Sequence, residues 1–140
     1  MTKLYSIATI RKRVREYGKK IDAPKEFLTV RATTDSLGRP HVEIDHSGYH
    51  FIVCERGNEL ERRTTKDLQT LLYWIFELIV FQMASEYELH HRKPVEDFRK
   101  VLFSKQLDLF EKLDAQWFAL KRKELEDILE EHPYEERKVM

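Results

Sequence analysis

The sequence predicts an α+β fold with an N-terminal helix, an antiparallel meander of three to four strands, and three long α-helices packed on the sheet. Apolar residues recur at helical spacing near the N-terminus and through the C-terminal half. Between about residues 28 and 63 they alternate with polar residues, which is typical of strands. The loops in this region are short, which favours antiparallel neighbours. At 140 residues the chain fits a single domain, residues 1–140.

The first helix is expected over residues 2–17, with Gly18 placed to end it. Its apolar stripe consists of Ile7, Ile10, Val14 and Tyr17. A second face of the same helix is basic and carries Arg11, Lys12, Arg15 and Lys19.

Four strands are expected after this helix, over about residues 28–32, 42–45, 49–54 and 59–63. The third strand has apolar residues on both faces, which indicates a central position. The fourth is charged, as edge strands often are. Turn residues separate the strands at 35–38, 46–48 and 56–58.

A long helix is expected from about Thr65 to Arg92, with Thr64 and Thr65 as capping residues and Asp67 in the first turn. Apolar residues cover most of its circumference, so we expect it to be packed on several sides.

Two further helices complete the expected fold. Pro94 is placed to begin the next one. Asp114 is placed to cap the last helix, which runs to about Glu131 before His132-Pro133. The residues expected to face inward are Phe98, Leu102, Leu109, Leu113, Phe118, Leu125, Ile128 and Leu129.

Charge and cysteine content narrow the classes of function. The formal net charge is zero, which weighs against a protein that coats nucleic acid. Cys54 is the only cysteine and no signal-peptide pattern is visible, which predicts a reducing, cytoplasmic location. The most apolar run, Leu71–Ala84, is shorter than the roughly 20 residues of a membrane span. We therefore expect a buried core helix and no membrane contact.

Two residue pairs were weighed for chemistry, and neither is complete. Glu88 and His91 share a helix face, but a di-iron bundle needs two such motifs and two further glutamates. Cys54 and His50 share a strand face but are separated by about 13 Å at strand rise, too far for a hydrogen bond. We therefore expect no metal, no cofactor and no enzymatic activity. A small metal-dependent enzyme is an alternative.

Five charged residues are expected to form a structural polar network, namely Glu77, Glu88, Arg92, Asp97 and Arg99. Glu77 lies inside an apolar run, where an acid is more often paired with an arginine than used as a general base. We expect Glu55, Arg56 and Glu59 to lie near this network, at the junction of sheet and helices.

Charge is unevenly distributed between the two ends of the chain. Residues 1–31 carry nine Lys/Arg against three Asp/Glu, whereas residues 124–136 carry seven Asp/Glu and no Lys or Arg. The basic first helix makes a nucleic-acid-binding or regulatory protein the main alternative function. The acidic segment is a candidate partner-binding surface through Glu126, Asp127 and Glu130.

An ordered series of short motifs extends from residue 55 to residue 106. It consists of Glu55-Arg56-Gly57-Asn58-Glu59, Thr64-Thr65-Lys66-Asp67, Leu71-Leu72-Tyr73-Trp74-Ile75-Phe76, Ala84-Ser85-Glu86-Tyr87-Glu88, Arg92, Asp97-Phe98-Arg99, Phe103 and Gln106. The chain resembles the immunity protein 63 family of bacterial polymorphic toxin systems over about residues 49–133.

The resemblance implies a protein that protects its producer by binding and neutralising a cognate toxin domain. It implies no catalytic site and names no toxin. The turn residues Glu55, Arg56, Asn58 and Glu59 form a second candidate surface for that partner. Monomer and homodimer both stay open.

Overall fold

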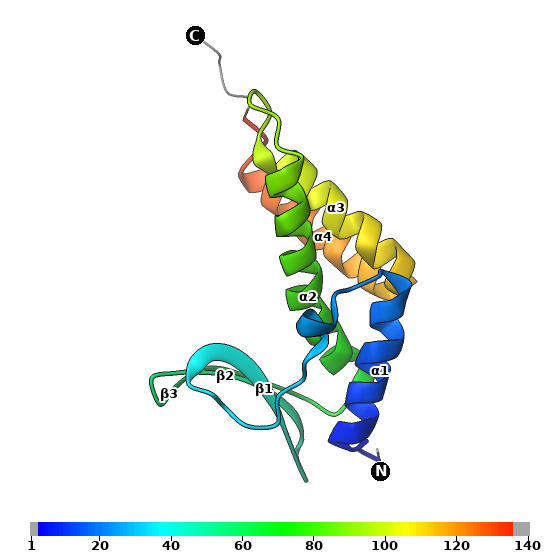
Figure 1. Cartoon of the computed structure of the whole chain (residues 1–140), viewed down its shortest axis with the longest axis vertical. Helices are drawn as coiled ribbons and strands as arrows, with labels where there is room; N and C mark the ends of the chain where they lie inside the picture. The colour runs from blue at the N-terminus through cyan, green and yellow to red at the C-terminus, as the bar shows by residue number, and fades with distance from the viewer. Residues whose placement is uncertain (1–2, 136–140) are drawn as a thin grey trace. The chain divides into compact units, whose positions relative to one another are not determined.

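The computed structural model describes residues 3–135 and confirms the predicted α+β fold. In chain order the elements are α1 (Ile7–Lys20), the short 3₁₀ helix η1 (Lys25–Leu28), β1 (Leu37–Asp45), β2 (Gly48–Glu55), β3 (Asn58–Thr65), α2 (Leu68–His90), α3 (Phe98–Leu113) and α4 (Ala115–Glu131) (Figure 1). The strands form one antiparallel sheet in the order β1-β2-β3. The central strand and the charged edge strand are therefore where the sequence predicted them.

The chain folds into two compact units, both of which include part of the long helix α2. The first unit contains the residues up to Lys19 and Pro24–Glu77, and the second contains Lys20–Ala23 and the residues from Leu78 onward. The single domain over residues 1–140 stays a prediction, because compactness does not show whether the units unfold together.

The first helix differs from the prediction at both ends. It begins at Ile7, where the Ser6 hydroxyl accepts a hydrogen bond from the backbone N–H of Thr9 at 3.2 Å. This hydroxyl satisfies one of the free N–H groups of the first turn, so the helix begins there rather than at residue 2.

Gly18 does not end α1 but lies buried inside it. A Cβ added at this glycine would lie 2.6 Å from Cδ1 of Leu28. The glycine therefore lets the Leu28 side chain pack directly on the helix backbone, a contact that any larger residue would obstruct.

The strand expected over residues 28–32 is wrong. Lys25–Leu28 form η1, in which Phe27 N–H donates to the Pro24 carbonyl at 3.0 Å. Beyond η1 the backbone makes an isolated bridge between Arg31 and His41. The alternation of apolar residues here arises because Leu28 packs on α1 and Val30 is buried, not because a strand forms.

The sheet packs one of its faces on the first half of α2. This face includes Val42, Phe51 and Arg63, which are paired across the three strands. The rings of Phe51 and Trp74 lie 6.4 Å apart between centroids. The Arg63 guanidinium lies 5.3 Å from both ring centroids, which fixes it over the aromatic pair. The predicted packing of β2 against α2 is confirmed.

Asp67 caps α2, which corrects the expectation that the threonines do so. The Asp67 carboxylate accepts a hydrogen bond from the backbone N–H of Thr70 at 3.1 Å, and the helix begins at Leu68. Thr64 and Thr65 belong to β3 instead, and the Thr65 hydroxyl accepts from the backbone N–H of Asp67.

The second half of α2 has an exposed apolar face. Leu78, Phe81 and Leu89 are exposed, so the expectation of packing on several sides holds only for the first half, where Leu71 and Leu72 are buried. Among the described residues, α2 is long and apolar enough to cross a membrane, but core helices of soluble proteins have the same length and composition.

The second unit packs the end of α2 against α3 and α4, which lie side by side (Figure 1). Its apolar core includes Ala84, Leu102, Phe103 and Leu125. Phe98 is exposed and Phe118 is half-buried, contrary to expectation, whereas Trp117 is buried.

Aspartates cap the N-termini of α3 and α4. Asp97, not Pro94, caps α3, because its carboxylate accepts from the backbone N–H of Arg99. Asp114 caps α4 as predicted and accepts from the backbone N–H groups of Gln116 and Trp117. A proline has no side-chain oxygen to accept a backbone N–H of the first turn, whereas Asp97 has one, and α3 begins at the next residue, Phe98.

Candidate partner-binding surface

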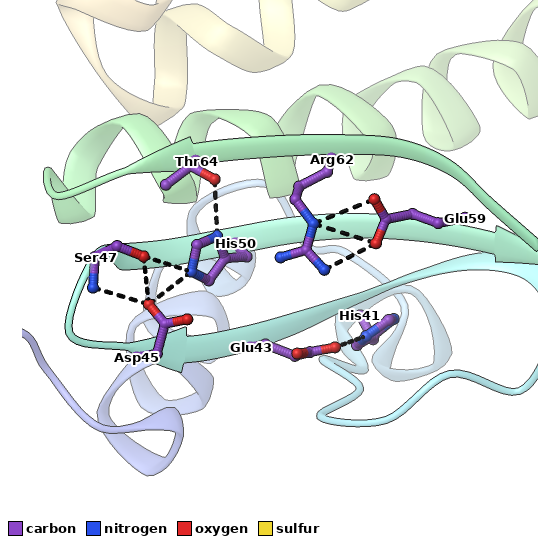
Figure 2. Close-up of polar contacts among 8 residues, drawn as sticks. All are labelled: His41, Glu43, Asp45, Ser47, His50, Glu59, Arg62 and Thr64. Carbon is purple, nitrogen blue, oxygen red and sulfur yellow. Dashed lines mark hydrogen bonds and ion pairs between the residues drawn. The ribbon is translucent and has the colours of Figure 1, made fainter.

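The sheet face opposite α2 carries a cluster of hydrogen-bonded polar side chains. We call it the polar sheet face and define it as His41, Glu43, Asp45, Ser47, His50, Glu59, Arg62 and Thr64 (Figure 2). Strand pairing places Glu43, His50 and Thr64 side by side across all three strands. The cluster therefore spans the whole width of the sheet.

His50 lies at the centre of the cluster, on β2, and is buried. Its Nε2 donates to the Asp45 carboxylate at 2.8 Å, and its Nδ1 lies 2.7 Å from the Thr64 hydroxyl (Figure 2). A carboxylate accepts only, so Nε2 is the donor nitrogen toward Asp45. One imidazole thereby holds side chains from both neighbouring strands.

Asp45 is held in a fixed position at the turn between β1 and β2. The Ser47 hydroxyl donates to its carboxylate at 2.6 Å and the Ser47 backbone N–H at 2.9 Å. These bonds, with that from His50, lower the pKa of Asp45 far below its usual range, and the Ser47 hydroxyl contributes most. Asp45 is about half exposed, so it presents a fixed negative charge to solvent.

A second imidazole supports a second carboxylate in the same way. His41 is buried, and its Nε2 lies 2.7 Å from Oε2 of the half-exposed Glu43. Its other ring nitrogen, Nδ1, has no hydrogen-bond partner among the described residues. Buried imidazoles thus lie beneath exposed carboxylates at two places on this face.

Arg62 adds one positive charge to this acidic face. Its guanidinium donates to Glu59 at 2.8 Å, a bond that lowers the pKa of Glu59 and raises that of Arg62. Glu43 and Asp45 also raise the pKa of Arg62, which shows that the three carboxylates share one electrostatic environment. Three carboxylates and one guanidinium leave this face negative when both imidazoles are neutral.

The turn between β2 and β3 continues this face to one end of the sheet. It contains the predicted partner-binding residues Glu55, Arg56, Asn58 and Glu59, all of which are exposed. Arg56 has a φ of 52°, a conformation that residues with a Cβ seldom adopt. Its backbone N–H is held by the Ser36 carbonyl at 3.0 Å. Gly57 also has a positive φ, of 78°, and a two-residue hairpin turn with positive φ at both positions matches the twist of the strands that it joins.

Two large apolar side chains are exposed at the same end of the sheet. Leu37 is 69% and Leu60 is 61% exposed. The strand register shifts between Leu37 and Pro40, and again between Val53 and Cys54 opposite Leu60. The charged turn therefore has exposed apolar side chains beside it.

The other predicted partner-binding residues lie on α4 and are also exposed. Glu126 pairs with Arg122 at 3.8 Å, and Asp127 pairs with Lys123 at 2.6 Å. These are exposed pairs on one helix, which are weak and mobile. Glu130 lies farther along the same helix. The acidic segment is therefore partly neutralised by basic residues just before it in the sequence.

The five residues of the predicted polar network lie in three ion pairs. Glu88 accepts from Arg92 at 2.6 Å, and Asp97 accepts from Arg99 at 2.8 Å. Glu77 lies 3.7 Å from Arg63 of β3. The pairing of Glu77 with an arginine is as predicted.

The expected link between this network and the sheet stays a prediction. Glu55, Arg56 and Glu59 belong to the first unit, whereas Glu88 and Arg99 belong to the second.

The residues weighed for chemistry have other contacts. Both carboxylate oxygens of Glu88 accept from Arg92, and Nδ1 of His91 is bonded to the Tyr87 carbonyl. Among the described residues, no group of three or more potential metal ligands lies together. His50 is engaged by Asp45 and Thr64 rather than by Cys54.

Sequence reasoning missed most of the polar sheet face. It considered His50 only as a partner of Cys54 and did not single out His41, Glu43, Asp45 or Arg62. The sequence does contain a pattern that predicts this face: polar residues at 41, 43 and 45 alternate with apolar ones and therefore share a face. The short turns at 46–47 and 56–57 would have aligned them with residues 50 and 62.

The fold and this surface define a small α+β protein with a fixed, charged sheet face. Comparison with protein-family models gives the class of protein. The chain belongs to the immunity protein 63 family, whose model matches residues 45–127. The matched region contains β2, β3, α2 and α3 and most of α4, and it includes Asp45, His50 and the turn at Arg56. No curated protein and no solved structure matches the chain.

Proposed function

We propose that this protein neutralises a cognate bacterial toxin by direct contact, using the polar sheet face and the adjoining β2–β3 turn, in the cytoplasm of the cell that makes the toxin. Family membership supports an immunity role, and a non-enzymatic one. The observation that supports this surface is the pair of exposed carboxylates, Asp45 and Glu43, each held by a buried imidazole.

Fixed carboxylates favour tight binding because their side chains lose little conformational freedom when a partner arrives. A cationic toxin side chain that meets Asp45 gains a charge-assisted hydrogen bond without the cost of ordering the acceptor. The surplus of negative charge also accelerates encounter with a basic surface. Leu37 and Leu60 supply the apolar contact that charged surfaces lack.

The proposal is tested with toxin domains sought among the products of the genes that neighbour this one. Glu43→Lys should weaken binding by about tenfold or more and abolish protection of growth when the toxin is expressed, since reversal of an interface charge costs several kcal/mol. Glu111→Lys is the matched control, because it makes the same change of net charge at an exposed residue of α3. It should bind within about twofold of the wild type.

Two results would contradict the proposal. Equal loss of binding in Glu43→Lys and Glu111→Lys would show that only total charge matters. Tight toxin binding by Glu43→Lys, with unchanged protection, would remove the polar sheet face from the interface. Circular dichroism of both variants establishes that each is folded before binding is compared.

A further inference from the structure

A groove in the first unit combines a cationic wall with an apolar floor. We call it the α1 groove and define it by its lining residues, Arg11, Arg15, Lys19, Lys25, Leu28, Thr29 and Val30. Its volume is about 610 Å³, within the range of pockets that bind small molecules. It lies before residue 45, outside the region that the family model matches, so family membership does not account for it.

The groove is fixed at two points. At one end, Leu28 packs on the helix backbone at Gly18. At the other end, Nε and Nη2 of Arg11 donate to the Val30 carbonyl at 3.1 and 2.9 Å. These contacts hold the segment after η1 at a set distance from α1. The groove is therefore preformed, which lowers the entropic cost of filling it.

The positive charges of the groove are not offset by acidic residues in its lining. None of the residues that line it is acidic, and no ion pair joins Arg15, Lys19 or Lys25 to a carboxylate among the described residues. Arg11, Arg15 and Lys19 are spaced four residues apart, a spacing at which like charges repel. On α4, by contrast, Lys121, Arg122 and Lys123 are each paired with a carboxylate. The cations around the groove therefore differ from those of α4 in having no ion pair among the described residues.

We infer that the α1 groove binds a small organic anion, one that carries a carboxylate, sulfonate or phosphate group on an apolar body. The guanidinium of Arg15 and the ammonium groups of Lys19 and Lys25 bind the anionic group. Leu28 and the adjoining residues contact the apolar body. A nucleic-acid strand is less well matched, because a groove of this size does not follow a repeating backbone. The inference is independent of toxin binding, which we assign to the sheet.

The test uses anilinonaphthalene sulfonate as the anionic probe and N-phenylnaphthylamine as its uncharged counterpart. Fluorescence titration of the folded, full-length protein should give saturable binding of the sulfonate and at least about tenfold weaker binding of the amine. The double variant Arg15→Glu, Lys19→Glu should lose sulfonate binding by a similar factor. The control Arg122→Glu, Lys123→Glu changes net charge equally on α4 and should retain it.

A neutral variant tests the floor of the groove. Thr29 is exposed and lines the groove, so Thr29→Trp should occupy its volume and weaken sulfonate binding without a change of charge. Retained binding in this variant would overturn the inference.

Three other results would overturn it as well. The first is an equal loss of sulfonate binding in both double variants, and the second is equal affinity for the two probes. The third is displacement of the bound sulfonate by a single-stranded oligonucleotide at a concentration below that of the sulfonate. The last would assign the surface to nucleic acid.

Discussion

Asp45 illustrates how one residue serves both the fold and the surface. Its carboxylate closes the β1–β2 turn through Ser47 and is bonded to His50 of the central strand. Because those bonds satisfy the ionised form, the carboxylate stays negative while half exposed. Arg56 is a second such residue, since it forms the β2–β3 turn and its backbone N–H donates to the Ser36 carbonyl.

The lowered pKa of Asp45 predicts acid sensitivity. A carboxyl whose folded pKa is depressed stabilises the protein above its unfolded pKa of about 3.9, and this contribution is lost as pH falls through the folded value. Ser47→Ala removes the largest cause of the shift, so it should raise the pKa of Asp45 and flatten the fall in stability below about pH 4. NMR titration of the Asp45 carboxyl and urea unfolding at several pH values measure both effects. An ordinary pKa for Asp45 in the wild type would refute this account.

At the scale of elements, contacts between segments decide where helices and strands end. Asp67, Asp97 and Asp114 each start a helix because their carboxylates accept backbone N–H groups of the first turn. In contrast, Gly18 lies inside α1 although glycine normally favours a helix end. The reason is Leu28, which occupies the space where a side chain would be.

This packing predicts that Gly18→Ala changes the free energy of unfolding in opposite directions with and without the Leu28 side chain. In an open helix, alanine is more favourable than glycine by about 1 kcal/mol. In the wild type the new methyl group meets Leu28, and overpacking costs about 1–3 kcal/mol, so the variant should be destabilised or unchanged. In the Leu28→Ala background the same substitution should stabilise. Urea unfolding of the wild type, the two single variants and the double variant measures this coupling. If the two substitutions change the free energy of unfolding additively, the coupling is disproved.

The whole molecule has no net charge but carries separate surfaces of opposite sign. The polar sheet face has three carboxylates against one guanidinium and is held by buried groups, whereas the α1 groove is lined by cations and lacks acidic residues in its lining. On α4, Glu126 and Asp127 are in exposed pairs with the preceding basic residues, and neither is held by a buried group. We therefore propose that the toxin is recognised by the sheet rather than by these residues of α4.

Association kinetics distinguish these two acidic surfaces. The triple variant Glu126→Gln, Asp127→Asn, Glu130→Gln should associate with the toxin domain within about twofold of the wild-type rate. Its rate should also keep the wild-type dependence on salt. Stopped-flow measurement over a range of ionic strength gives both quantities. A slower rate with a shallower salt dependence would place the interface on α4 after all.

The amino-acid pattern by itself determined the fold class, the central position of Tyr49–Cys54 and the cap at Asp114. Periodicity and capping are local properties, so they can be read along the chain. The motif series around Glu55–Glu59 likewise indicated the family that the comparison confirms.

Only the tertiary structure decided which polar residues share a surface. The link between His50 and Thr64 depends on strand register, and a shift of one residue would turn every side chain to the opposite face. The place of Gly18 inside α1 depends on Leu28, ten residues away, and the α1 groove depends on the bond from Arg11 to Val30. These features arise from contacts between segments, and a local pattern contains no information about which segments will meet.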